Sequence, residues 1–370
     1  MLQIDRRVLS HFDFLIPLII LPIIITSHIL IGEINPTLAH KQTIYFIIGI
    51  GAFLLFFILP IRKFIWIVPF FYWFNILLLA LVDIIGVTKL GATRWLEIPF
   101  VHFTIQPSEI FKPFFILMLA YLIKNDPPPK EGYDIKKFLK FSFYILLPFF
   151  LIAKEPDLGT AMILLFVGYG TLFIVGVNRK IWISIFIIIV VSAPILYNSL
   201  HDYQKKRIEA FIHNKPSYHV KQSLITIGSG GLTGKKKEEA TQARFKFLPI
   251  ATSDFIFAYF VERFGFWGAL TLISAYALLI IHLLITNYKL KGDYLASVSV
   301  SALALMIFFY MSINIAMTIG LSPVVGVPLP FFSYGGSSFI TFMMLFGIVE
   351  NMLAFRFDSL YESIHYRFGE

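Results

Sequence analysis

The chain has 370 residues, of which 58% are hydrophobic, 17% aromatic and only 14% charged. Soluble domains contain roughly 45–50% apolar and about 25% charged residues, so this composition excludes a water-soluble globular fold. The formal net charge of +9 suits an anionic lipid surface, and the sequence carries no nucleic-acid-binding motif. It has no cysteine and therefore no disulfide.

Apolar segments near the ~20 residues that a helix needs to cross a bilayer recur along the chain. They predict an all-α polytopic membrane protein with one integral membrane domain over residues 1–370. We expect ten spans, at 12–31, 43–59, 65–85, 108–123, 141–154, 158–177, 181–200, 265–286, 295–319 and 337–355. Residues 255–264 are expected to lie at the interface or to dip into the membrane.

The distribution of basic residues predicts the orientation. Outside the longest loop, 15 Lys and Arg fall in the two tails and the loops on the same side, whereas the opposite short loops hold only Lys41, Lys89, Arg94 and Lys154. The positive-inside rule therefore places both termini in the cytoplasm.

One long polar stretch, residues 201–254, interrupts the apolar sequence and holds ten Lys/Arg and five Asp/Glu. The predicted orientation makes it extracytoplasmic, against the positive-inside rule, which weakens for loops approaching ~60 residues. A basic loop at the bilayer edge indicates a protein that acts on an anionic molecule there.

Asp254 ends this loop and opens an aromatic segment with Phe255 and Phe257. Burial against these rings would raise the pKa of its carboxyl, and nearby cations would lower it. Such a group is suited to act as a general base. The alternative is an N-cap for the following helix, and the sequence leaves both open.

Charged residues also gather at the outer ends of other spans. Arg94 and Trp95 lie in the second outer loop, and Glu109 and Lys112 are spaced to pair on one face of the next helix. A self-neutralising ion pair with an interfacial Trp anchor would explain them equally well.

Residues 154–160 (Lys-Glu-Pro-Asp-Leu-Gly-Thr) place three charges between two spans. Pro156 at a first helical position and Asp157 at the positive end of a helix dipole explain much of this sequence. The presence of Lys154 and Glu155 in so short a hairpin is left unexplained.

Residues 228–237 fail the phosphate-binding P-loop pattern, because five residues separate Gly228 from Gly234 and Lys236 stands where Ser or Thr is needed. The N–H groups of a glycine-rich turn flanked by lysines could still hold a diphosphate. Solvated lysines are the more common outcome.

The last outer loop, residues 320–338, is apolar and rich in Pro and Gly. Irregular backbone at membrane depth must be buried in protein or line a cavity, so we expect this loop to shape a groove wall.

Taken together, these segments resemble the SEDS family (shape, elongation, division and sporulation) of bacterial cell-wall proteins. The resemblance rests on the order and spacing of residues 91–95, 106–112, 156–160, 228–235, 241–242, 254–257 and 328–338. The short tails, Asp13-Phe14 and residues 246–249 most resemble the elongation branch, RodA, rather than the division branch, FtsW. The family usually has Pro-Glu-x-His-Thr-Asp before Phe-Ile-Phe, whereas residues 249–254 lack both the Glu and the His.

The resemblance implies ten helices around a cavity open to the outer leaflet of the bacterial cytoplasmic membrane, and a peptidoglycan glycosyltransferase that polymerises lipid II during elongation. Inversion at the sugar would need a base, for which Asp254 is expected, and cations or a divalent metal ion (Mg²⁺ or Mn²⁺) for the departing diphosphate. The expected substrate-binding residues are Arg94, Trp95, Glu109, Lys112, Asp157, Arg207, Lys235 and Ser333.

A class B penicillin-binding protein, the transpeptidase that crosslinks the glycan, is the implied partner, along with other elongation proteins. Two other functions remain open at this point. A lipid II flippase would need ionisable residues towards the cytoplasmic half, and a structural scaffold of the elongation machinery would not need Asp254.

Overall fold

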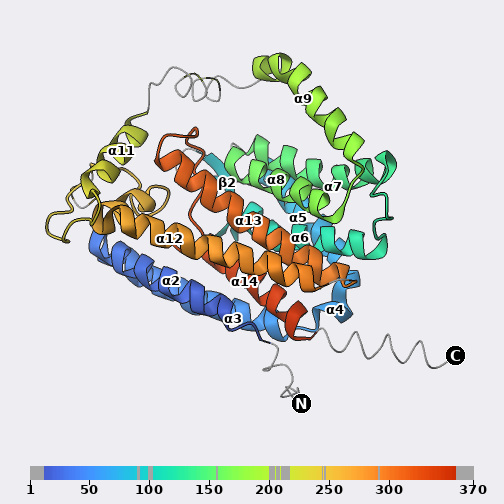
Figure 1. Cartoon of the computed structure of the whole chain (residues 1–370), viewed down its shortest axis with the longest axis horizontal. Helices are drawn as coiled ribbons and strands as arrows, with labels where there is room; N and C mark the ends of the chain where they lie inside the picture. The colour runs from blue at the N-terminus through green and yellow to red at the C-terminus, as the bar shows by residue number, and fades with distance from the viewer. Residues whose placement is uncertain are drawn as a thin grey trace.

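The structure is a computed structural model that describes residues 12–355 except 90–91, 99–102, 156, 200–204, 206–208, 210–216, 244, 246 and 291. The described chain is mostly helical (Figure 1). The helices of its first half are α2 (Leu15–Ile34), α3 (Pro36–Ile58), α4 (Ile61–Phe64), the 3-10 helix η1 (Ile65–Ile67), α5 (Val68–Ile85), α6 (Pro107–Asn125), α7 (Ile135–Lys154) and α8 (Leu158–Val175). Those of its second half are α9 (Arg179–Ser199), α11 (Tyr218–Gly230), α12 (Ile256–Lys289), α13 (Tyr294–Thr318) and α14 (Gly336–Ala354).

Every predicted span falls on one of these helices. Within the described residues, seven helices are long and apolar enough to cross a membrane: α2, α3, the α4–α5 run, α8, α12, α13 and α14. The helices at the other three predicted spans are α6, α7 and α9. Of these, α6 and α7 carry several charged residues.

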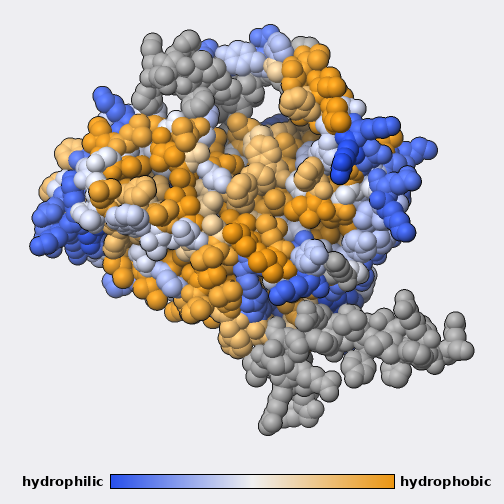
Figure 2. Space-filling model, in the orientation of Figure 1, coloured by the Kyte–Doolittle hydropathy of each residue, from blue (hydrophilic) through white to orange (hydrophobic). Residues whose placement is uncertain are grey.

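Helix α13 lies at the centre of the bundle. It packs against α12, α6, α8, α14 and the shorter α11, and most of its residues are buried. In Figure 1, α9 extends away from the bundle beyond its first turns, where Trp182 packs against aromatic rings of α7 and α8. Helix α11 lies over the end where α12 begins. Figure 2 shows apolar side chains across the middle of one face and hydrophilic residues gathered towards its ends, as expected for a protein surrounded by lipid.

Polar caps define where several helices begin. Asn35 accepts hydrogen bonds from the N–H groups of Thr37 and Leu38 at the start of α3. Asp134, Ser217 and Asp293 cap α7, α11 and α13 in the same way. Such side chains replace the missing partners of the first helical N–H groups.

The segment expected to dip or lie at the interface, residues 255–264, forms the first part of α12. Gly265 breaks the helix with φ 67° and ψ −165°, a conformation that favours glycine. A Cβ at this position would lie 2.4 Å from the backbone nitrogen of Gly234, so the break also allows the outer loop to pack closely. Residues 256–262 are therefore a separate buried helical segment.

A small antiparallel sheet, which the sequence did not predict, fills the second outer loop. Its strands are β1 (Val87–Lys89), β2 (Ala92–Ile98) and β3 (Phe103–Ile105), in the order β1-β2-β3. Residue Val87 pairs with Trp95, and Leu96 pairs with Ile105. The sheet fixes the direction of the side chains on β2, since neighbours on a strand point to opposite faces.

The irregular stretch between α13 and α14 is buried mainly over residues 327–333, whereas residues 320–326 are more exposed. Side chains of three helices donate hydrogen bonds to its carbonyl oxygens: Ser27 to Phe332 at 2.6 Å, Tyr276 to Pro330 at 2.5 Å, and Asn314 to Val327 at 2.6 Å. Buried backbone without regular structure needs such partners.

The two ends of the described chain lie side by side. The N–H of Asp13 donates to the carboxylate of Glu350 at 3.1 Å, and His282 Nε2 lies 2.5 Å from Asp13 Oδ2. Both ends are therefore on one face of the bundle, as the even number of predicted spans requires.

Candidate active site

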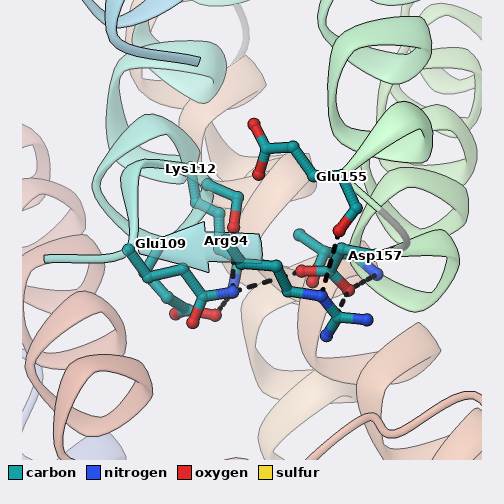
Figure 3. A network of polar contacts seen from close by, with 8 residues as sticks. Arg94, Glu109, Lys112, Glu155 and Asp157 are labelled. Atoms are coloured by element: carbon teal, nitrogen blue, oxygen red, sulfur yellow. Dashed lines mark hydrogen bonds and ion pairs between the residues drawn. The ribbon is translucent and has the colours of Figure 1, made fainter. Parts of the chain in front are cut away.

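Arg94 reaches from β2 towards the turn between α7 and α8. Its Nε donates to the backbone oxygen of Glu155 at 3.2 Å, and its NH1 lies 3.7 Å from Asp157 Oδ1. Figure 3 shows the guanidinium beside this turn, with Glu109 and Lys112 on the other side of the Arg94 chain. The strand pairing of β2 thus carries a cation to the beginning of α8.

Asp157 is nearly buried, with 4% of its side chain exposed. Its Oδ1 accepts from the N–H of Thr160, so it caps α8. Its Oδ2 accepts from Gln106 Nε2 at 3.2 Å. The sequence placed Asp157 at the positive end of a helix dipole, and the structure shows it as the N-cap of α8, while Pro156 lies outside the described residues. The same carboxylate also faces Arg94, which makes it part of the charged network.

Glu109 and Lys112 pair on α6, as their spacing predicted. The Lys112 Nζ donates to Glu109 Oε1 at 2.5 Å, and 0% of the Lys112 side chain is exposed. The ammonium also lies 4.9 Å from the ring centre of Tyr310, a distance at which a cation is attracted to an aromatic face. The pair is therefore a buried element of the bundle rather than an ion pair at the lipid surface.

Asp254 lies in the turn that precedes α12. The N-cap position belongs to Phe255, which makes no side-chain cap, so the alternative that Asp254 caps the helix is not supported. The turn includes Ile250 at φ 54°, a strained conformation for a β-branched residue. The side-chain amide of Asn314 and the backbone N–H of Tyr334 hold it in place through the oxygens of Asp254 and Thr252, at 3.0 and 2.8 Å.

The charges around Asp254 come from three separate elements. Burial raises the pKa of its carboxyl, and the carboxylate of Asp157 acts in the same direction. The Arg94 guanidinium and His219 on α11 lower this pKa. Asp254 Oδ2 would lie 3.6 Å from a Cβ at Gly326, so the loop between α13 and α14 passes beside the carboxylate. The sequence predicted this balance of burial and nearby cations, and a base requires it.

Ser333 was expected to bind substrate, but its hydroxyl is engaged within the protein. It donates to the backbone oxygen of Ser253 at 2.7 Å and accepts from the N–H of Leu329 at 2.8 Å. Its observed contacts therefore fix the turn that holds Asp254.

Some N–H groups of the glycine-rich turn, which the sequence left open as a diphosphate site, are used inside the protein. The stretch up to Gly230 ends helix α11, and the N–H of Gly234 donates to Gly230. The N–H of Lys235 donates to the backbone oxygen of Glu262. A Cβ at Gly230 would lie 2.1 Å from the oxygen of Val261, and one at Gly234 would lie 2.3 Å from that of Arg263, so these two glycines serve close packing against α12.

Lys235 lies beside this packed segment. Its backbone oxygen accepts from Arg263 NH1 at 2.5 Å, and Arg263 forms a two-pronged ion pair with Glu33 of α2. Arg263 follows Asp254 by nine residues, about 14 Å along a helix at ~1.5 Å per residue. The network around Arg94 and the contacts of Lys235 are therefore separate clusters in the described structure.

Trp95 and Arg207 are the remaining predicted substrate contacts. Trp95 follows Arg94 on β2 and consequently points to the opposite face of the strand. Arg207 lies outside the described residues.

Two residues at the site were not selected from the sequence. Glu155 is 2% exposed, and neither carboxyl oxygen has a hydrogen-bond partner among the described residues. Burial, followed by the charges of Asp157 and Asp83, raises its pKa to about 9, so the group is protonated at neutral pH. The sequence did contain a signal for Glu155, because this residue lies in a short hairpin with an unusual number of charges. His219 carried no such signal, because only folding brings α11 to Asp254.

The side chains at the site do not provide the ligands that a metal ion bound by the protein alone would need. Within the described residues, no three His, Cys, Asp or Glu side chains converge in a way that could hold one. A cationic group near Asp254 is the guanidinium of Arg94.

Comparisons with known proteins agree with this architecture. The chain is similar to the peptidoglycan glycosyltransferase MrdB of Helicobacter pylori (strain ATCC 700392 / 26695), with 54% identity over 362 residues that cover 98% of this chain and 95% of the relative. It is 39% identical to MrdB of Escherichia coli K12 over 292 residues, 77% of each chain. A probable FtsW of Coxiella burnetii is 32% identical over 288 residues, 75% of each chain.

Solved structures share the fold. A chain from a structure described as the coordination of polymerization and crosslinking by a peptidoglycan synthase complex matches with a TM-score of 0.81 and 24% identity, over 94% of this chain and 98% of that one. RodA of Thermus thermophilus matches with a TM-score of 0.68 and 24% identity, over 92% and 96%. The profile of the FtsW, RodA and SpoVE cell cycle proteins matches residues 3–357. With this match and these relatives, the chain belongs to the FtsW/RodA/SpoVE family, also called SEDS, and is most similar to its RodA (MrdB) members.

Proposed function

We propose that this chain is a peptidoglycan glycosyltransferase that polymerises lipid II, with Asp254 as the general base of an inverting reaction. The observation that carries this proposal is the position of the Asp254 carboxyl, which is partly buried and lies under the electrostatic influence of Arg94 and Asp157 from two other elements. The activity is that named for the MrdB relatives, to which the chain is 54% and 39% identical.

The chemistry assigns a task to each group. Lipid II carries its disaccharide α-linked to a diphosphate, and a β-1,4 product requires attack from the opposite face. Asp254 accepts the proton of the acceptor 4-hydroxyl, as the base of an inverting transfer does. Arg94 is the nearest cation for charge that develops on the departing diphosphate, because a guanidinium matches phosphate geometry.

Other residues of the charged network support Asp254 and Arg94. Asp157 orients Arg94, and the buried Glu109–Lys112 pair lies on the other side of the Arg94 chain. Trp95, Lys235 and Arg207 are further substrate contacts in this proposal, on the strength of the family resemblance alone. The side chain of Ser333 contributes through the turn that it holds.

The proposal places the protein in the bacterial cytoplasmic membrane, with both termini in the cytoplasm and residues 201–254 outside. The basic loop then lies where the diphosphate headgroup of lipid II is presented. A class B penicillin-binding protein is the proposed partner, in line with the structural neighbour that belongs to a complex of polymerization and crosslinking.

The test is polymerisation of labelled lipid II by the full-length protein purified in detergent, with and without the partner transpeptidase. We expect glycan chains from the wild type and a loss of about 10²–10⁴-fold in Asp254→Asn, the usual contribution of a positioned base. Glu238→Gln, an exposed carboxylate of the same loop, is the control and should retain full activity. Near-normal polymerisation by folded Asp254→Asn would exclude the base. Absence of polymerisation by the wild type, together with transport of lipid II after reconstitution into vesicles, would indicate a flippase.

A further inference from the structure

A short buried helix begins directly after Asp254. Residues 256–262 are all buried and form the first part of α12. Gly265 then interrupts this helix, with φ 67° and ψ −165°. A helix broken at such a point is no longer held in line by its own hydrogen bonds, so the position of the short part must come from contacts with neighbouring elements.

The outer loop supplies backbone partners at the break. The N–H groups of Phe266 and Trp267, which follow the break, donate to the backbone oxygens of residues 231–232 at 2.9 and 3.3 Å. On the other side of the break, the backbone oxygen of Glu262 accepts from the N–H of Lys235 at 2.9 Å. The loop segment therefore bridges the two parts of α12.

Glu33, near the end of α2, holds the side of the short helix. Its Oε2 accepts from the Tyr259 hydroxyl at 2.8 Å and from Arg263 Nε at 2.8 Å, and its Oε1 accepts from Arg263 NH2 at 3.1 Å. Tyr259 and Arg263 are four residues apart, on one face of the helix. A single carboxylate from a distant span thus fixes two successive turns of the segment that follows Asp254.

The burial of this ion pair indicates what it contributes. Only 9% of the Glu33 side chain and 16% of the Arg263 side chain are exposed. Removing two charges from water costs about as much as their attraction returns, so a buried pair adds little net stability. The two parallel hydrogen bonds of a guanidinium and a carboxylate do fix a direction. The pair is therefore suited to setting the position of the short helix.

We propose that Glu33 is a positioning residue for glycosyl transfer, which acts through Tyr259 and Arg263 on the helix that begins beside Asp254. This inference rests on the proposed function. Asn314 holds the turn in front of this helix through the backbone oxygen of Asp254. Glu33 holds the other end of the same segment, so the carboxyl group of the base is fixed from both directions along the chain.

The experiment measures kcat and KM for the polymerisation of labelled lipid II by the purified full-length protein, together with the thermal unfolding of each variant. Glu33→Gln keeps the shape of the side chain but replaces one acceptor oxygen with a donor that faces the guanidinium. We expect kcat to fall about tenfold with KM unchanged, because misplacing a reacting group by 1 Å can cost about 10²-fold in rate.

A second variant separates position from stability. Glu33→Leu/Tyr259→Phe/Arg263→Leu replaces the whole polar cluster with apolar groups, so that no buried charge or hydroxyl of the cluster is left without its partner. Such replacements are often neutral for stability, and the unfolding temperature should stay close to that of the wild type. The directed contacts are gone, and kcat should remain about 10–100-fold lower.

Asp293→Asn is the matched control for Glu33→Gln. Asp293 follows the other end of α12 and pairs with Arg62 at 2.6 Å, and this guanidinium also donates to the backbone oxygen of Met352. An asparagine can still cap α13 in place of the aspartate. The control should lose about as much stability as Glu33→Gln and keep the wild-type kcat.

Equal losses of kcat in Glu33→Gln and Asp293→Asn would overturn the inference, and this comparison decides if the triple variant does not fold. Recovery of both stability and kcat in the triple variant would mean that the cluster serves stability alone. A raised KM with unchanged kcat would mean that Glu33 contacts substrate, which also overturns the inference. Asp254→Asn separates the two proposals. If it is inactive while Glu33→Gln has the wild-type kcat, only the role of Glu33 fails; if it is active, the base itself is wrong.

Discussion

The side-chain amide of Asn314 joins Asp254 to the loop between α13 and α14. Its nitrogen donates to the backbone oxygen of Asp254 at 3.0 Å and to that of Val327 at 2.6 Å. One buried amide in the middle of the bundle therefore fixes two irregular segments that are far apart in sequence.

Replacing Asn314 with Leu should disturb the position of Asp254. Both carbonyl oxygens lose their donor, which should lower the free energy of unfolding by about 1–3 kcal/mol. The polymerisation rate of the folded protein should fall roughly 10–100-fold, because small displacements of a reacting group are costly. The matched control is Asn351→Leu, near the C-terminal end of α14, because the Asn351 amide also donates hydrogen bonds to two backbone oxygens, those of Phe57 and Leu59. It should lose similar stability but keep its rate; equal rate losses would contradict the role of Asn314.

The buried pair of Lys112 and Glu109 should be essential for stability as well as activity. Lys112→Met leaves a buried carboxylate without its cation, which costs about 3–5 kcal/mol. The double variant Lys112→Met/Glu109→Gln should recover most of this loss, as measured by denaturant unfolding in a double-mutant cycle. The exposed pair of Lys154 with Asp83 is the matched control, and Lys154→Met should cost at most about 1 kcal/mol.

Glu155 should make the protein less stable as the pH rises. Its pKa is raised from 4.5 to about 9, so the folded chain binds this proton more tightly than the unfolded chain. The free energy of unfolding therefore falls between these two pH values, and the contribution is fully lost above about pH 9. Glu155→Gln keeps the neutral shape and should lose less stability between pH 6 and 9. Thermal unfolding at several pH values checks this, with the exposed Glu238→Gln as control; parallel curves for wild type and Glu155→Gln would refute it.

Gly159 should tolerate no side chain. A Cβ there would lie 2.8 Å from the backbone oxygen of Val325 and equally close to Val327 Cγ2. Gly159→Ala should therefore cost about 1–3 kcal/mol and reduce the rate, since the overpacked backbone must shift beside Asp157. Gly51→Ala in α3 meets no atom within 4 Å and should stabilise by about 0.5–1 kcal/mol. Comparing the unfolding midpoints of the two variants tests the packing directly.

The helices could be predicted from the sequence because each apolar span is a local property of the chain. The same holds for the pair of Glu109 with Lys112, which depends only on helical spacing. The outer sheet could not be foreseen, since strands as short as Val87–Lys89 carry no clear alternation and are stabilised by their pairing.

The candidate site was only partly predictable, because some of its contacts form only when distant segments of the chain pack together. Asp254 and Arg94 could be selected because charge is expensive at the edge of a membrane. His219 could not, because its relation to Asp254 depends on how α11 packs against α13. For the glycine-rich turn the sequence left diphosphate binding open, and spacing alone does not reveal that the N–H groups of Gly234 and Lys235 are used inside the fold.

The backbone oxygens between α13 and α14 that accept side-chain hydrogen bonds affect how this segment can lie in the hydrocarbon of the membrane. The oxygens of Val327, Pro330 and Phe332 already accept hydrogen bonds from Asn314, Tyr276 and Ser27. An irregular backbone satisfied in this way needs no water, so it can lie at membrane depth inside the bundle. The segment from Val327 to Ser333 is mainly buried, and the chain passes Asp254 at Gly326. The backbone beside this carboxyl can therefore stay at the depth of the hydrocarbon without a layer of water around its peptide groups.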